Sequence, residues 1–248
     1  MPLVQLRFYG DLNDFLPRSS RQRTLERDVA PHQTVLDVIE ACNVPHPEVA
    51  VITVDGEAVA GDRHLAGGER VAVYPRFDSV DLGDVERIGP IEPVPRQFAL
   101  DVHLGRLARL LRLLGFDTWY RNDTDDEELA VFAASEHRML LTRDTGLLKR
   151  KIVEHGALVR SEQPAMQAVE VLRRFGLASD ASPFTRCLRC GALLEAVEKA
   201  EIERELEPGT RATYQDFSRC VRCGHLYWKG AHHERLRALV ASILAASA

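Results

Sequence analysis

The chain has few of the features that mark membrane, secreted or fibrous proteins. No apolar run in its 248 residues approaches the roughly 18 to 20 residues of a membrane-spanning helix. The N-terminus lacks the basic-then-apolar order of a signal peptide. With 12 Pro, 16 Gly and 45% hydrophobic residues, the composition excludes collagen, a fibrous rod and wholesale disorder. We therefore expect a cytoplasmic, globular protein without a membrane partner.

Cysteine is also scarce, and its distribution excludes a secreted disulfide scaffold. Four of the five cysteines form two Cys-x-x-Cys pairs late in the chain, which is the arrangement of a metal clamp. The fifth, Cys42, is expected to be a small buried apolar residue on a helix.

Basic residues are outnumbered by acidic residues in the first part of the chain. Residues 1–95 hold 9 basic and 16 acidic side chains, a net charge of -7, whereas residues 96–248 hold 23 and 21, a net charge of +2. An anionic partner would therefore prefer the second part.

The first 77 residues predict a compact ββαββ domain. Val4, Leu6 and Phe8 alternate as in a half-buried strand, and Thr34 precedes a helix with Asp37 in its first turn. Further strands are expected near residues 23–29, 49–54 and 69–74. The order and the segments 8–10, 34–37 and 65–75 resemble the β-grasp ubiquitin-like proteins of the sulfur-carrier type. Because Gly67-Gly68 is internal and the chain continues past Pro75, carrier chemistry is not expected, and the domain's protein partner is unknown.

A Pro-rich segment predicts a boundary between independent cores. Residues 78–95 read as a linker, with Gly89, Pro90, Pro93 and Pro95 making it extended and fairly stiff. Removing residues 1–77 is accordingly expected to leave the rest folded. Residues 96–182 then alternate strand and helix, which predicts an α/β domain with a parallel sheet and flanking helices.

Acidic residues follow the predicted strands of this sheet. Asp101 and Asp144 each come directly after an apolar strand, where parallel sheets collect functional groups. A third acidic group, containing Asp125 and Asp126, precedes the second helix. It can alternatively be read as an N-terminal cap, since Thr124 and Glu127 have capping-box spacing. Converging carboxylates need a cation among them, so Asp101, Asp126 and Asp144 are candidate catalytic ligands of Mg²⁺ or Mn²⁺, with Asp125 the alternative to Asp126.

Basic residues beside these acids suggest a phosphate-binding track. Three arginines recur every three residues after Asp101, and further cations flank Asp144. A basic helical stripe is also what a solvated face looks like; beside a metal site it is a candidate RNA contact. The candidate RNA-binding residues are Arg106, Arg109, Arg112, Arg143 and Lys149.

The segments 101–117, 125–129 and 141–144 together resemble the Mut-seven C-terminal RNase family. The similarity covers residues 96–233, with His103 and Leu110 in place of an expected Met and Trp. The resemblance implies a PIN-like fold and ribonuclease activity on RNA, with tRNA and other structured RNAs as candidate substrates.

The two cysteine pairs predict a zinc ribbon over residues 183–248. Both knuckles read Cys-x-Arg-Cys-Gly, and Cys187, Cys190, Cys220 and Cys223 are expected to hold one structural zinc ion. His225 and His232 are expected to pack rather than ligate. Residues 234–246 have the apolar spacing of a helix that docks on its neighbour.

The expected architecture is thus a β-grasp domain, a PIN-like α/β nuclease domain and a zinc ribbon. The function predicted for it is that of a metal-dependent ribonuclease. The rival from another class is a non-catalytic RNA-binding or regulatory protein that uses the same surfaces. A phosphatase ranks last, because no Asp-x-Asp-x-Thr pair follows the first strand of the domain.

Overall fold

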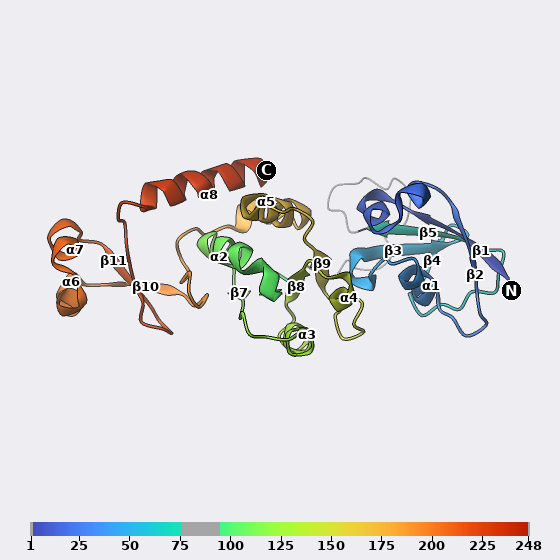
Figure 1. The fold of residues 1–248 in the computed structure, drawn as a ribbon, viewed down its shortest axis with the longest axis horizontal. Coiled ribbons are helices and arrows are strands. Elements are labelled where there is room, and N and C mark those ends of the chain that lie inside the picture. The colour runs from blue at the N-terminus through green and yellow to red at the C-terminus, as the bar shows by residue number, and fades with distance from the viewer. Residues whose placement is uncertain (1, 76–94, 248) are drawn as a thin grey trace.

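The computed structural model describes residues 2–75 and 95–247, which form three parts arranged in chain order along the long axis of the molecule (Figure 1). The predicted linker, residues 78–95, lies outside the described residues except for its last position. In the described part of the chain, no helix is long and apolar enough to cross a membrane.

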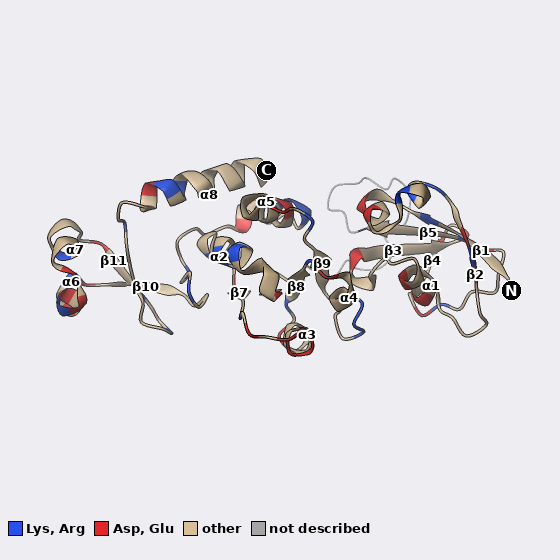
Figure 2. Cartoon of the chain, viewed as in Figure 1, with Lys and Arg blue, Asp and Glu red and all other residues tan. Residues whose placement is uncertain are grey.

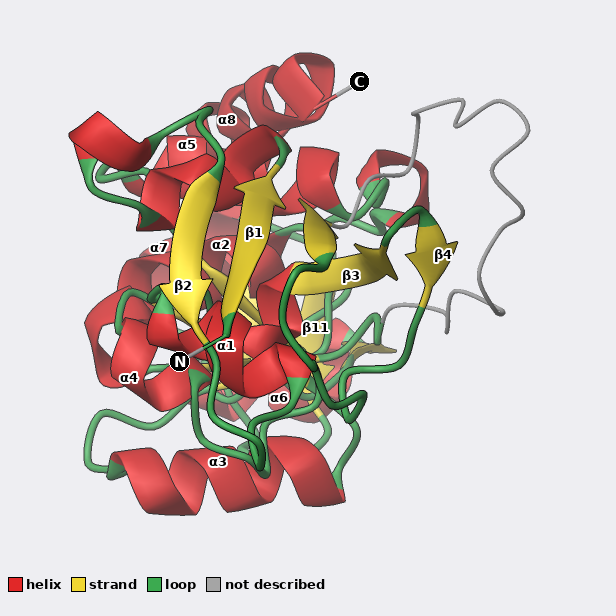
Figure 3. Cartoon of the chain, turned by 90° about the vertical axis from the view of Figure 1, so that its right-hand side faces the viewer, coloured by secondary structure: helices red, strands yellow, loops and turns green. Residues whose placement is uncertain are grey.

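The first part is the predicted β-grasp domain. Its sheet has the order β2-β1-β5-β3-β4, in which β1 and β5 are parallel and the other pairs antiparallel. Val4, Leu6 and Phe8 all point into the core, as their alternation predicts. The helix packs against the sheet (Figure 3) and begins with a capping box between Thr34 and Asp37. The elements are β1 Leu3–Phe8, η1 Gly10–Phe15, η2 Arg18–Ser20, β2 Leu25–Asp28, α1 Val35–Ala41, η3 His46–Glu48, β3 Val49–Val54, β4 Glu57–Ala58 and β5 Arg70–Pro75.

The central domain is a parallel sheet of order β7-β6-β8-β9 with helices on both faces, which confirms the α/β prediction. Two helices, α2 and α5, share one apolar core with the sheet, while α3 and α4 share another on the opposite face. The elements are β6 Phe98–Leu100, η4 Val102–Leu104, α2 Gly105–Leu113, β7 Thr118–Trp119, α3 Asp126–Ser135, β8 Met139–Thr142, α4 Thr145–Leu148, β9 Gly156–Leu158, α5 Pro164–Arg174 and η5 Ala178–Asp180.

The third part is a three-stranded antiparallel ribbon followed by a long helix. The ribbon has the order β10-β11-β12, with two short helices inserted between its first two strands. The last helix, α8, turns back along α5 (Figure 1) and places Val240 and Ile243 in the core of the central domain, so the predicted docking helix is confirmed. The elements are β10 Leu194–Val197, α6 Lys199–Ile202, η6 Glu203–Glu205, α7 Pro208–Thr213, β11 Phe217–Cys220, β12 Leu226–Trp228 and α8 His233–Ser247.

A tight contact joins the ribbon to the end of α2. Gly115 has φ +94°, and a Cβ there would lie 2.1 Å from the carbonyl oxygen of Ser182. Only glycine adopts this positive φ readily and, because it has no Cβ, lets the Ser182 carbonyl come this close. Backbone N–H groups of Ser182 and Phe184 donate to the carbonyls of Leu114 and Leu113, at 2.9 and 3.0 Å. The chain entering the ribbon is therefore fixed to the central domain.

The β-grasp domain also contacts the central domain, through polar groups. Glu48 is fully buried; its Oε1 accepts a 2.6 Å hydrogen bond from the N–H of Leu158, and its carboxylate pairs with Arg174. Arg160 reaches Asp11 at 3.3 Å and Asp14 at 3.6 Å. The buried apolar clusters of the two domains are distinct, but Leu158 of β9 packs against both, and the domains share a buried ion pair. The expectation that the rest stays folded after removal of residues 1–77 does not allow for this interface.

Candidate functional site

Asp101 and Asp144 lie at the same edge of the parallel sheet, as predicted. Asp101 follows β6 and Asp144 lies two residues beyond β8, the strand paired directly with β6. The next strand in sequence after β6, β7, pairs on its other side, so the strand order reverses at β6. In open α/β sheets such a switch point, at the carboxyl ends of the strands, is where ligands bind.

A threonine that the sequence analysis did not single out connects these two acids. The hydroxyl of Thr142 donates to Asp101 Oδ2 at 2.6 Å and accepts from the backbone N–H of Asp144 at 2.9 Å. Asp101 is 3% exposed, and its Oδ1 accepts from the N–H of His103 at 2.8 Å. Asp144 is exposed, and its Oδ1 accepts from the N–H of Gly146 at 2.7 Å. The position of Thr142, last in a buried strand and between the two motifs' acids, is the signal that could have identified it.

The third acidic group lies at the start of α3, and its cap differs from the predicted one. Asp125, not Thr124, is the N-cap residue, and its Oδ1 accepts from the N–H of Glu128 at 2.8 Å. The predicted capping box of Thr124 and Glu127 is therefore wrong by one position. Asp126 is the first helical residue and is exposed. Figure 2 shows acidic residues concentrated at this end of α3.

The four candidate carboxylates have no cationic partner among the described residues, a property they share with other acids such as Glu127 and Glu154. Asp123 pairs with Arg121, whose hydrogen bond lowers the pKa of that carboxyl, and Asp117 pairs with Arg138. Among residues 2–75 and 95–247, no ion pair involves Asp101, Asp125, Asp126 or Asp144. Within the same described residues, no three of these carboxylates lie close enough together to form a metal-ligand group.

The candidate RNA-binding residues have different surroundings. Arg106, Arg109 and Arg143 are exposed, as a phosphate contact requires. Lys149 faces the β-grasp domain, where its Nζ donates to Asn43 Oδ1 at 2.8 Å and to the carbonyl of Glu40 at 3.3 Å.

Arg112 is a correction to the predicted basic track. It is 4% exposed, and its guanidinium donates to the carbonyls of Thr118 at 3.0 Å and Arg189 at 3.0 Å. Burial lowers the pKa of Arg112, and negative charge on the sulfurs of Cys190 and Cys187 acts in the opposite direction. Arg112 therefore anchors the first cysteine knuckle to α2 and does not contribute to the exposed surface.

The four cysteines of the ribbon come together as predicted. The Sγ atoms of Cys187, Cys190, Cys220 and Cys223 all lie within 4.8 Å of one another, with 3.6 Å between Cys187 and Cys223 and 3.4 Å between Cys190 and Cys220. Tetrahedral zinc with Zn–S bonds of about 2.3 Å separates its sulfurs by about 3.8 Å. The cluster therefore fits a metal ion such as zinc.

The surroundings of the cluster lower the pKa of Cys187 and Cys220 and raise the pKa of Cys190 and Cys223. Burial opposes ionisation of Cys187, but hydrogen bonds from the Tyr227 hydroxyl, at 3.2 Å, and from backbone N–H groups lower the pKa of this thiol to about 6. Burial raises the pKa of Cys190 to about 12. A bound cation is what would allow all four sulfurs to be thiolates together.

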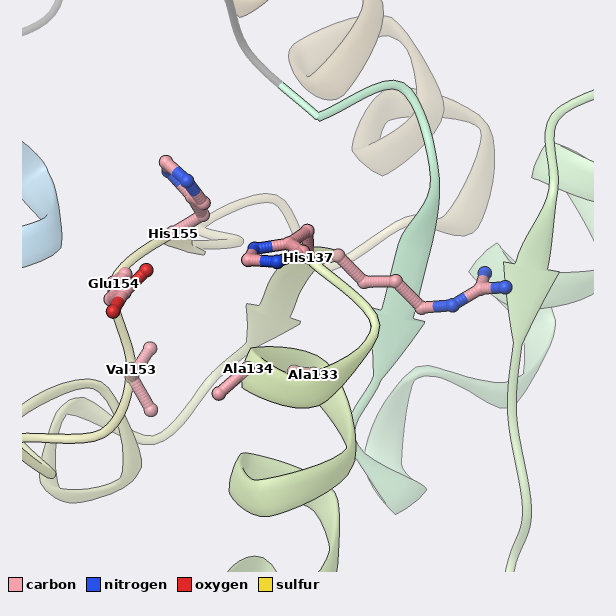
Figure 4. Close-up of a pocket in the computed structure, with 7 residues that line it drawn as sticks. Ala133, Ala134, His137, Val153, Glu154 and His155 are labelled. Carbon is pink, nitrogen blue, oxygen red and sulfur yellow. The ribbon is translucent and has the colours of Figure 1, made fainter. Parts of the chain in front are cut away.

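A small cavity at the other edge of the sheet has no comparable chemistry. His137 follows α3, and Glu154 and His155 precede β9, so these side chains lie at the amino ends of the strands (Figure 4). The cavity has a volume of about 10 Å³, room for about one water molecule. It is too small for a substrate.

Fold and site together define a three-part protein, with a ubiquitin-like domain, an α/β domain with acids at its sheet edge, and a four-cysteine ribbon. The family model of the Mut7-C RNAse domain matches residues 96–240 of the sequence, and the family model of the Mut7-C ubiquitin domain matches residues 1–81. The chain therefore belongs to the Mut7-C RNAse domain family.

Solved structures with a likeness to this chain are small proteins. Small archaeal modifier protein 1 of H. volcanii is 20% identical, covers 31% of this chain and 100% of its own, and gives a TM-score of 0.26. A putative molybdopterin converting factor, subunit 1, from Pyrococcus furiosus is 19% identical over 31% of this chain and 100% of its own, also with a TM-score of 0.26. No curated protein matches the chain.

Proposed function

We propose that the protein is a metal-dependent ribonuclease whose site lies at the carboxyl ends of β6 and β8. The observation that carries this proposal is the hydrogen-bonded series Asp101–Thr142–Asp144 at the strand-order switch, in a chain of the Mut7-C RNAse domain family. The carboxylates offer the hard oxygen ligands that Mg²⁺ and Mn²⁺ prefer, and Asp101 and Asp144 are linked through Thr142.

The proposed roles follow from the surroundings of each acid. Asp101 is held by hydrogen bonds from His103 and Thr142, and Asp144 is exposed. Asp126 is the proposed third ligand, and Asp125, already used as a cap, is the alternative. A bound divalent ion would supply an activated water and stabilise charge on the phosphodiester. Arg106, Arg109 and Arg143 are proposed to hold RNA phosphates, and zinc on the four cysteines is proposed to be structural.

Asp144→Asn is expected to reduce cleavage by about 100-fold or more while RNA affinity and folding persist. Asparagine keeps volume and can still accept the bond from Gly146, but loses the charge. The measurement is the rate of cleavage of single-stranded RNA, tRNA and DNA with Mg²⁺ or Mn²⁺ added.

Asp123→Asn is the matched control, because this nearby acid is already paired with Arg121, and it should cleave at the normal rate. Comparing Asp125→Asn with Asp126→Asn identifies the third ligand. Unreduced cleavage by Asp144→Asn refutes the site. RNA binding without cleavage by the unmodified protein supports the non-catalytic alternative instead.

A further inference from the structure

Two neighbouring cavities lie between α2, α8 and the ribbon. The first, of about 350 Å³, lies among α2, α5 and α8. The second, of about 720 Å³, lies between the ribbon strands and the start of α8. Leu113, Leu188 and Leu236 line both, so the two cavities share a wall. We name this feature the ribbon groove.

The two ends of the ribbon groove have different chemistry. Among the described residues, the lining of the first cavity is apolar except for Arg106 and Arg109 and includes no acidic side chain. The second is lined by aromatic rings, including Trp228, which is 42% exposed. Over both cavities the charged residues are Arg106, Arg109, Arg186 and Lys229 against Glu198 and Asp216, an excess of two positive charges.

Trp228 is held so that its indole can accept a stacked ring. A Cβ at Gly230 would lie 2.9 Å from its Nε1, so this glycine admits the indole against the backbone. The ring of Phe217 supports it, with centroids 6.4 Å apart. Aromatic side chains that combine a supported ring with solvent exposure are the stacking platforms of single-strand binding.

We propose that the ribbon groove binds a single-stranded segment of RNA and leads it from the ribbon to the sheet edge. A base stacks on Trp228, and phosphates contact Arg106 and Arg109. Arg106 lies in the first turn of α2, five residues after Asp101, so the proposed path runs toward the end of α2 that follows the proposed catalytic site in the chain. The inference rests on the proposed ribonuclease function and specifies how its substrate approaches.

The cysteine cluster shapes the middle of this path. Leu188, in the shared wall, lies between Cys187 and Cys190, and its N–H donates to the Tyr227 hydroxyl at 2.9 Å. Arg112 holds the carbonyl of the following residue, Arg189. A ribbon that loses its metal would therefore lose the wall that joins the two cavities.

The test uses the chain's two tryptophans, Trp119 and Trp228, as separate reporters. Trp119 stacks on Phe132 on the far face of the central domain. In full-length Trp119→Phe, titration with a short oligouridylate without added divalent cation is expected to quench the remaining fluorescence of Trp228. In Trp228→Phe, which keeps only Trp119, no comparable quenching is expected. Equal responses in the two variants, or no RNA binding at all, overturn the groove.

The dependence of RNA affinity on salt concentration tests the proposed phosphate contacts of Arg106 and Arg109. For single strands, log K falls with log salt by about 0.7 per phosphate contact, so Arg106→Gln with Arg109→Gln should lower the magnitude of the slope by about 1.4. Arg23→Gln with Arg63→Gln, two exposed arginines of the β-grasp domain, removes the same charge and should leave the slope unchanged. A slope equal to that of the unmodified protein in the first variant overturns the proposed contacts.

Binding and cleavage are scored separately, so the two proposals can fail separately. Quenching of Trp228 without cleavage keeps the groove and refutes the nuclease. Cleavage at the normal rate without any response of Trp228 refutes the groove alone.

Discussion

Replacing Cys220 by serine is expected to abolish metal binding and unfold the ribbon. Cys220 is 2% exposed, ends β11 and lies 3.4 Å from the sulfur of Cys190. Zinc bound by four thiolates contributes about 10–16 kcal/mol of apparent folding free energy to small zinc modules, and the ribbon's own apolar clusters are small. Within the ribbon, only replacement of one of the other three cysteines should have a comparable effect.

Elemental analysis measures this directly. We expect about one zinc per unmodified chain and less than about a tenth of an equivalent in Cys220→Ser. Cys42→Ser is the matched control, because Cys42 is the one cysteine outside the cluster and lies in the β-grasp core. Acidification should also release the metal, since protons compete for the thiolates. Full zinc content in Cys220→Ser would contradict the four-cysteine site.

Glu48→Gln is expected to destabilise the contact between the β-grasp and central domains by about 3–5 kcal/mol. Burial would lower the pKa of Arg174, but the charge of Glu48 raises it, so this guanidinium stays charged in the interior. Glutamine removes the compensating charge while keeping nearly the same volume. Arg174 then becomes a buried cation without its partner, whereas Arg160 keeps Asp11 and Asp14.

Urea unfolding, followed by hydrogen exchange at η3 and β9, measures this effect. Asp55→Asn serves as the control, because the pair of Asp55 with Arg70 is at the surface and should contribute less than about 1 kcal/mol. Glu48→Leu combined with Arg174→Met, which removes both charges, should be less harmful than Glu48→Gln. A change below about 1 kcal/mol in Glu48→Gln would mean that the interface is weak and the domains are modular after all.

The acids at the sheet edge were predictable because their placement follows from local rules. An apolar strand running directly into Asp101, and another ending before Asp144, place both at one edge once strands and helices alternate. The cysteine cluster was equally predictable from knuckle spacing. Neither prediction needs knowledge of contacts between distant segments.

What the sequence did not reveal depends on such contacts. Arg112 shares the three-residue spacing of Arg106 and Arg109. Six residues after Arg106, however, a side chain leaves the helix in a direction about 120° away from that of Arg106. Arg112 therefore contacts the ribbon. The interface around Glu48 joins segments more than a hundred residues apart, and nothing in the residues near Glu48 identifies Arg174 as its partner. The cap of α3 shifted by one position because Thr124 and Asp125 are both good caps.

The packing of α8 against α5 affects how the ribbon behaves when no metal is bound. The ribbon is fastened at its start by Phe184 and beyond its end by Val240 and Ile243, so a demetallated ribbon is a closed loop and not a loose tail. A closed loop has fewer open conformations than a tail of the same length, so less entropy is lost when metal returns. Proteolytic nicking of that loop would leave two fragments still held together by the α5–α8 contact. Such nicked protein would run as an intact particle on gel filtration and separate only on denaturation.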